Sequence, residues 1–185
     1  MTMRTSNMLR FVPTLVTVLL IVGYRLMPHP WNFVPVTAMA IFGGIYLNRS
    51  LAYGLPLASM IVADLFLGMD WTSPVVYASI LVSSWIGTRV RNVYENKKQF
   101  AVAVGGGTLA SSVLFYLTTN FAAWLVIPEY TKDISGLIQS YIMAIPFFKN
   151  ALAGDMFFIV VFVGVYEAIH FIVTKLSRQS APIHG

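Results

Sequence analysis

Six apolar runs, separated by short polar stretches, decide what this chain can fold into. They are Phe11–Met27, Phe33–Leu47, Leu51–Leu67, Pro74–Val90, Ala101–Ile127 and Ala151–Thr174. A membrane-spanning helix needs about 20 apolar residues, within a range of roughly 17 to 25. The runs therefore predict an all-α, polytopic membrane helix bundle with six transmembrane helices. The second and third runs are short, and flanking polar side chains would have to extend them to the interfaces.

Composition agrees with a membrane protein and excludes several chemistries. Of the 185 residues, 57% are hydrophobic and 10% are charged, whereas soluble domains carry about 25% charged residues. The chain has no cysteine, which excludes disulfides, thiolate metal sites and cysteine nucleophiles. No Ser-His-Asp, HExxH or rhomboid-like motif is present. We therefore expect no enzyme, no resident cofactor and no metal site.

One stretch before the last run is ambiguous. Ile134–Phe148 is moderately apolar and contains Gln139 and Pro146. A further span here would have to turn at Lys149 and Asn150 alone, which is too short for antiparallel helices. We predict an interfacial or re-entrant segment that lies over the bundle.

Basic residues predict the orientation. With the N-terminus inside, nine of the 12 Lys and Arg residues fall on the cytoplasmic side, and the other three are Arg25, Lys132 and Lys149. This positive-inside bias places both termini in the cytoplasm. It predicts a cytoplasmic N-terminus at 1–10, one transmembrane domain at 11–174 and a cytoplasmic tail at 175–185. The net charge of +5 thus records topology, and we expect membrane lipid and no nucleic acid as partner.

Polar residues gather toward the predicted outer side. A charge in or near hydrocarbon costs several kcal/mol unless it is paired or wet, so such residues form a functional-site hypothesis. The first outer loop holds Arg25, His29 and Asn32 in a stiff path set by prolines. A rigid interfacial loop with incidental polar groups is an equal alternative. Arg25 is the nearest partner for Asp64, either as a structural ion pair or as the wall of a wet cavity.

The fifth and sixth runs add a second set of candidates. Tyr116, Asn120 and Trp124 share a helix face at four-residue spacing, which suits the wall of a site for a flat organic ligand. Anchoring in the interfacial aromatic belt is the alternative for Trp124. Asn150 is in position to cap the sixth span, and Asp155 lies about one turn deeper.

Small residues at four-residue spacing predict close contacts between helices. Examples are Ala40 with Gly44, and Ser83 with Gly87. In lipid, close packing relies on such residues. Packing inside the bundle is the favoured interpretation, and docking of a separate membrane partner stays open.

Several of these segments carry a resemblance. RLMPHPWNFVPVTAMAIFGG, ADLFLG, FYLTTNFAAW and IPFFKNALAGD resemble an uncharacterised family of small bacterial membrane proteins, over most of residues 24–160. That family is in turn similar, in size, span number and capping first loop, to the S-components of energy-coupling-factor vitamin transporters, including the solitary cobalamin-specific type.

The resemblance implies a function. S-components bind a vitamin in an outward-facing pocket in the bacterial inner membrane, with a transmembrane coupling subunit and two ATPases as partners. The substrate-binding candidates are then Arg25, His29, Asn32, Asp64, Tyr116, Asn120, Trp124, Asn150 and Asp155. Two departures count against it: Phe11–Met27 lacks the Ala-x-x-x-Ala contact motif, and the cysteine of some cobalamin members is absent. The alternative is a structural scaffold protein of a cell-envelope complex.

Overall fold

The computed structural model describes residues 22–28 and 30–179, and this part of the chain contains helices and loops but no strand. The helices are α2 (Val36–Tyr46), α3 (Arg49–Leu67), α4 (Ser73–Arg91), α5 (Lys97–Val126) and α6 (Ile134–Gln179). A helical turn at 22–26 precedes them. The predicted all-α class is confirmed for the described residues. The first predicted span lies almost wholly outside them.

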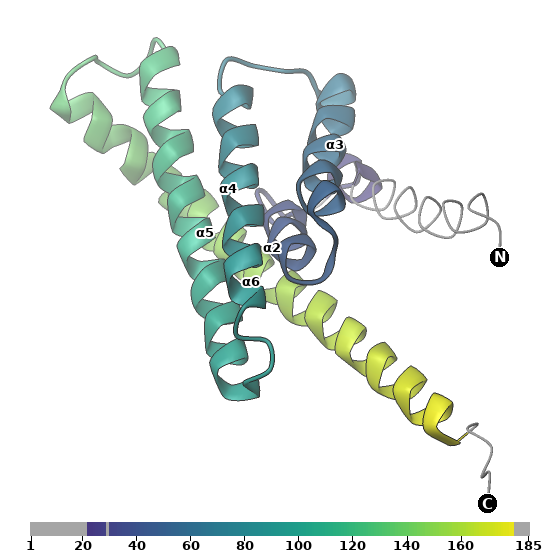
Figure 1. Ribbon diagram of the computed structural model, residues 1–185. Helices are drawn as coiled ribbons and strands as arrows, with labels where there is room; N and C mark the ends of the chain where they lie inside the picture. The colour runs from purple at the N-terminus through teal and green to yellow at the C-terminus, as the bar shows by residue number, and fades with distance from the viewer. Residues whose placement is uncertain (1–21, 29, 180–185) are drawn as a thin grey trace, which may run out of the picture.

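Three helices are long and apolar enough to cross a membrane. They are Arg49–Leu67, Lys97–Val126 and the segment Ile134–Leu176 of α6. The chain is therefore a multi-pass membrane protein. Figure 1 shows α3, α4 and α5 standing side by side while α6 crosses them obliquely. The loops 68–72 and 127–133 lie at the same end of the bundle, which we call the cavity end.

The second apolar run does not form a span of its own. α2 has 11 residues, so it is about 16 Å long, against about 30 Å for the hydrocarbon core. Val36, Ala38, Ala40 and Ile41 are among its many buried residues. α2 is thus an inner helix, enclosed by its neighbours rather than exposed to lipid along its length.

The predicted interfacial segment is also corrected. Residues 134–148 are the first part of α6, a single helix of 46 residues. Lys149 and Asn150 lie inside this helix, so no turn occurs there and Asn150 caps nothing. Pro146 is accommodated within the helix, as happens in membrane helices where neighbouring groups satisfy the freed carbonyl. The C-terminal half of α6 extends beyond the other helices (Figure 1).

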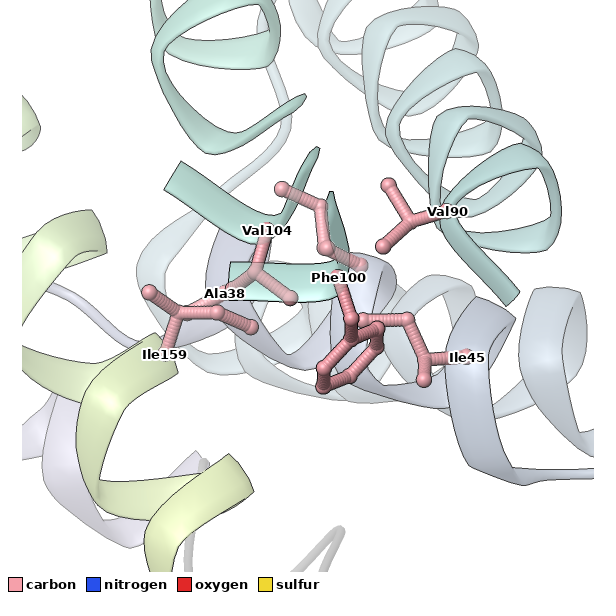
Figure 2. Packing of buried hydrophobic residues seen from close by; sticks show 7 residues of the cluster. Ala38, Ile45, Val90, Phe100, Val104 and Ile159 are labelled. Atoms are coloured by element: carbon pink, nitrogen blue, oxygen red, sulfur yellow. The ribbon is translucent and has the colours of Figure 1, made fainter. Parts of the chain in front are cut away.

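The core forms around α2. Ala38, Ile41 and Ile45 pack with residues from the other helices (Figure 2): Val90, Phe100, Val104 and Ile159. α2 and α4 approach so closely at Gly44 and Gly87 that a Cβ on Gly87 would lie 2.3 Å from the carbonyl oxygen of Ile41. The small-residue packing predicted within the bundle is confirmed at this crossing.

Candidate functional site: a polar cavity between the helices

A cavity of about 490 Å³ opens at the cavity end. All five labelled helices contribute to its wall, together with the segment before α2. The floor lies against the first turn of α2, and the rim includes the loop between α3 and α4. The lining combines apolar side chains with polar ones from separate helices, and the polar members include Arg25, Asn32, Thr37, Asp64, Asp70, Ser112, Tyr116, Asn120 and Asp155.

An ion pair forms one wall. Arg25 Nη1 lies 3.1 Å from Asp64 Oδ1, which confirms the predicted partner of Asp64. Tyr77 of α4 donates its hydroxyl to Asp64 Oδ2 at 2.8 Å, and the same Arg25 nitrogen lies 3.0 Å from the sulfur of Met60. Asp64 is 7% exposed. Three segments of the chain therefore meet on one carboxylate at the depth of the last turn of α3.

Asp155 lies at the floor of the cavity and bonds to the first turn of α2. Its Oδ2 accepts a hydrogen bond from Ser112 Oγ of α5 at 2.7 Å. The hydroxyl of Thr37 and the backbone N–H of Ala38 are its other donors. The residue that precedes α2 is Pro35, which supplies no side-chain cap. Asp155, from α6, thus takes the place of a local cap at the start of α2.

Asp70 lies at the rim and caps α4. Its Oδ1 accepts hydrogen bonds from the backbone N–H and hydroxyl of Thr72 and from the N–H of Ser73. These bonds, above all the one from the Thr72 hydroxyl, hold the pKa of Asp70 below its usual range. The side chain is therefore charged at neutral pH, and it is exposed.

Aromatic side chains form the opposite wall. Tyr116 of α5 packs against Phe148 of α6 with ring centroids 4.7 Å apart, and its hydroxyl donates to the carbonyl of Tyr141 at 2.7 Å. Phe147 stacks on Trp31 of the first loop at 5.6 Å. Phe115, Tyr116, Phe147 and Phe148 all line the cavity. A flat apolar group would therefore find several aromatic side chains here.

The structure brings six of the nine predicted site residues to this cavity: Arg25, Asn32, Asp64, Tyr116, Asn120 and Asp155. Two others lie elsewhere. Trp124 is not part of the lining and donates its indole N–H to the carbonyl of Thr131 at 2.8 Å. Asn150 is exposed on α6, also outside the lining. His29 lies outside the described residues.

Comparison with known families gives one match. A family model described as a family of unknown function, DUF6580, matches residues 5–177. The chain belongs to this family. No curated protein and no solved structure matches the DUF6580 chain. The matched description names no activity, so any function has to be argued from the cavity itself.

Sequence reasoning missed several residues that line the cavity of this DUF6580 protein or hold its carboxylates. Thr37 and Ser112 hold Asp155, and Tyr77 holds Asp64. Hydroxyl groups in membrane helices commonly bond to the carbonyl four residues earlier, as Ser112 also does with Thr108. Their presence in an apolar run therefore gives no signal of a site. Phe147 and Phe148 lay in the stretch that we assigned to a separate segment.

Proposed function

We propose that this DUF6580 protein captures a small organic molecule, of vitamin or cofactor size, in the cavity from the outer side of the membrane. The observation that carries the proposal is the convergence of Arg25, Asn120 and Asp155, from segments far apart in the sequence, on one cavity. Its volume of about 490 Å³ falls within the roughly 300–1,000 Å³ of small-molecule sites. Such sites combine an apolar or aromatic wall with a few convergent polar groups.

The mode of action in this proposal is that of an S-component. The chain contains no P-loop motif, so energy for transport would have to come from a transmembrane coupling subunit and ATPases. The support for this part is the sequence resemblance and the small helical bundle with a cavity at one end. The protein would then hand its ligand on rather than transform it.

The direct test is thermal stabilisation of the purified protein in detergent. Vitamins and cofactor precursors would be screened, beginning with cobalamins and their fragments. A true ligand stabilises the fold by about 2.7 kcal/mol at a hundredfold excess over its Kd. Asn120→Leu should abolish the shift, because Asn120 lines the cavity. The matched control is Asn150→Leu, which removes a side-chain amide from an exposed position outside the lining. This variant should keep the thermal shift.

A scaffold role is the second candidate, and one observation favours it. The carboxylates of Asp64 and Asp155 already have donors from neighbouring helices, namely Arg25, Tyr77 and Ser112. Such bonds are enough to explain these residues as structural contacts between helices. A complete screen without any shift, or a shift that Asn120→Leu leaves intact, would favour the scaffold role over ligand capture.

A further inference from the structure

Arg25 has donor groups that contacts within the described structure do not use. Its hydrogen bonds to Asp64 Oδ1 at 3.1 Å and to the sulfur of Met60 at 3.0 Å both come from Nη1. Among the described residues, neither Nε nor Nη2 of this side chain has an acceptor. A guanidinium carries five N–H donors in a fixed plane, and the Arg25 side chain is only 17% exposed. Because Arg25 lines the cavity, its second edge is available to a hydrogen-bond acceptor there.

The charge of this guanidinium is already balanced. Asp64 contacts it at 3.1 Å, and the second oxygen of Asp64 accepts from the hydroxyl of Tyr77 at 2.8 Å. Arg25 is the only Lys or Arg residue in the lining that the structure describes. An anionic ligand would therefore lose its hydration without meeting an uncompensated positive charge. A neutral carbonyl oxygen costs less to bury and still gains a charge-assisted hydrogen bond.

Asn120 of α5 offers the complementary group. Its Nδ2 donates to the backbone carbonyl of Tyr116 at 2.7 Å. Because a backbone carbonyl can only accept, this bond determines which end of the side-chain amide is the nitrogen. Within the described part of the chain, Oδ1 of Asn120 receives no hydrogen bond. Asn120 also lines the cavity, so this oxygen is available to an N–H group of a ligand.

Other polar side chains of the lining are bonded to the protein itself. Ser112 donates its hydroxyl to Asp155 at 2.7 Å. The hydroxyl of Tyr116 donates to the carbonyl of Tyr141 at 2.7 Å, while its ring packs against Phe148. These residues therefore contribute more to an aromatic wall than to the polar recognition of a ligand.

We propose that the ligand of this cavity is an uncharged aromatic compound that carries a carboxamide or a lactam. This inference rests on the proposed function. A carbonyl oxygen of the ligand accepts from the free edge of Arg25, and a ligand N–H donates to Asn120 Oδ1. The ring packs against the aromatic wall formed by Phe115, Tyr116 and Phe148.

Three probes that share one ring and its N–H group test the inference. They are indole-3-acetamide, which is neutral and has a carboxamide, indole-3-acetate, which is an anion at neutral pH, and 3-ethylindole, which has no carbonyl. Each is added to the full-length protein in non-ionic detergent, and the melting temperature is measured over a concentration series. Indole-3-acetamide should raise the melting temperature at concentrations about tenfold lower than the other two, the difference expected for one hydrogen bond to a charged group.

A charge-conserving substitution assigns this effect to Arg25. Arg25→Lys keeps a positive charge beside Asp64 but removes the planar guanidinium and its second edge. Binding of indole-3-acetamide should weaken about tenfold, and the response to 3-ethylindole should not change. The matched control is Arg89→Lys. Arg89 lies over the ring of Trp85 and outside the lining, so its substitution should leave the binding of all three probes unchanged.

A second variant tests the other contact without disturbing the ion pair. Asn120→Leu removes the acceptor of the ring N–H, so it should weaken the binding of all three probes. Unchanged binding of indole-3-acetamide in either folded variant, Arg25→Lys or Asn120→Leu, would overturn the inference. Equal shifts from indole-3-acetamide and 3-ethylindole, or a larger shift from indole-3-acetate, would overturn it as well.

The wider vitamin screen separates this inference from the proposed function. A charged compound, or one without an amide or lactam, that stabilises the protein when none of the three probes does would overturn the ligand class alone. The proposed function would stand, because Asn120→Leu would still report binding in the cavity. Absence of any shift from any compound would overturn both.

Discussion

Arg91 of α4 donates from Nε to the carbonyl oxygen of Ile45 at 2.7 Å, in the last turn of α2. Its Nη2 also donates to the carbonyls of Gly44 and Leu47. Asp155 of α6 occupies the other end of the same helix. A short inner helix leaves unpaired groups at both ends, and here a side chain from another helix bonds to backbone groups at each end.

Removing the charge at the carboxyl end of α2 should destabilise the protein. Arg91→Met leaves backbone carbonyls of α2 without their donor, at a cost of about 1.5–3 kcal/mol. The midpoint of thermal unfolding in detergent measures the loss. Arg89→Met is the matched control, because Arg89 rests over the ring of Trp85 and bonds to no carbonyl of α2 in the described structure. Equal losses of thermal stability in both variants would mean that the bonds from Arg91 to α2 do not stabilise the protein.

The crossing of α2 and α4 should tolerate no side chain. In Gly87→Ala the new Cβ would lie 2.3 Å from a backbone oxygen of Ile41, and the backbone shift that relieves it costs about 1–3 kcal/mol. Gly105→Ala is the control on α5, where nothing lies within 4 Å of the added Cβ. There the change should be neutral or stabilise by about 0.5–1 kcal/mol. Retained thermal stability in Gly87→Ala would contradict the close crossing.

The sequence predicted the helical class and one ion pair better than it predicted the arrangement of the helices. Apolar periodicity and charge identified the helical class and the Arg25–Asp64 pair, because an isolated charge in hydrocarbon has few partners within reach. Hydropathy could not distinguish α2 from a span, because a helix enclosed by protein is as apolar as one enclosed by lipid. The capping of α2 by Asp155 joins residues more than a hundred positions apart, and no local pattern encodes such a contact.

The error at α6 has a different cause. Pro146 and the polar pair Lys149–Asn150 indicated the end of a helix, since proline disfavours helix in the preceding residue. In the structure the helix continues through these residues, so Tyr141 and Phe148 pack against Tyr116 of α5. Trp124 is a separate case. Its indole N–H donates to the carbonyl of Thr131 in the loop before α6, and the residue is not part of the cavity lining.

Arg25 and Asp64 should depend on each other. Arg25→Ala or Asp64→Ala leaves one buried charge uncompensated and costs roughly 3–5 kcal/mol. The double variant should lose much less free energy of unfolding than the sum of the two single losses. Thermal unfolding of the wild type, the two single variants and the double variant measures the difference. The pair of Lys97 and Glu167, 3.7 Å apart and more exposed, is the control and should give nearly additive losses. Additive losses at Arg25 and Asp64 would mean that each residue acts through other contacts.

The two ends of the bundle should face opposite sides of the membrane. The turn at 47–48 and the loop 92–96 lie away from the cavity end, whereas the loops 68–72 and 127–133 border the cavity. Because most Lys and Arg residues lie on the side of Arg49 and Lys98, the positive-inside bias predicts that this side is cytoplasmic. Reporter fusions after Arg49, after Lys98 and at the C-terminus should score cytoplasmic. Fusions after Asp70 and Lys132 should score outside. The reverse pattern would open the cavity to the cytoplasm and contradict capture from the outer side.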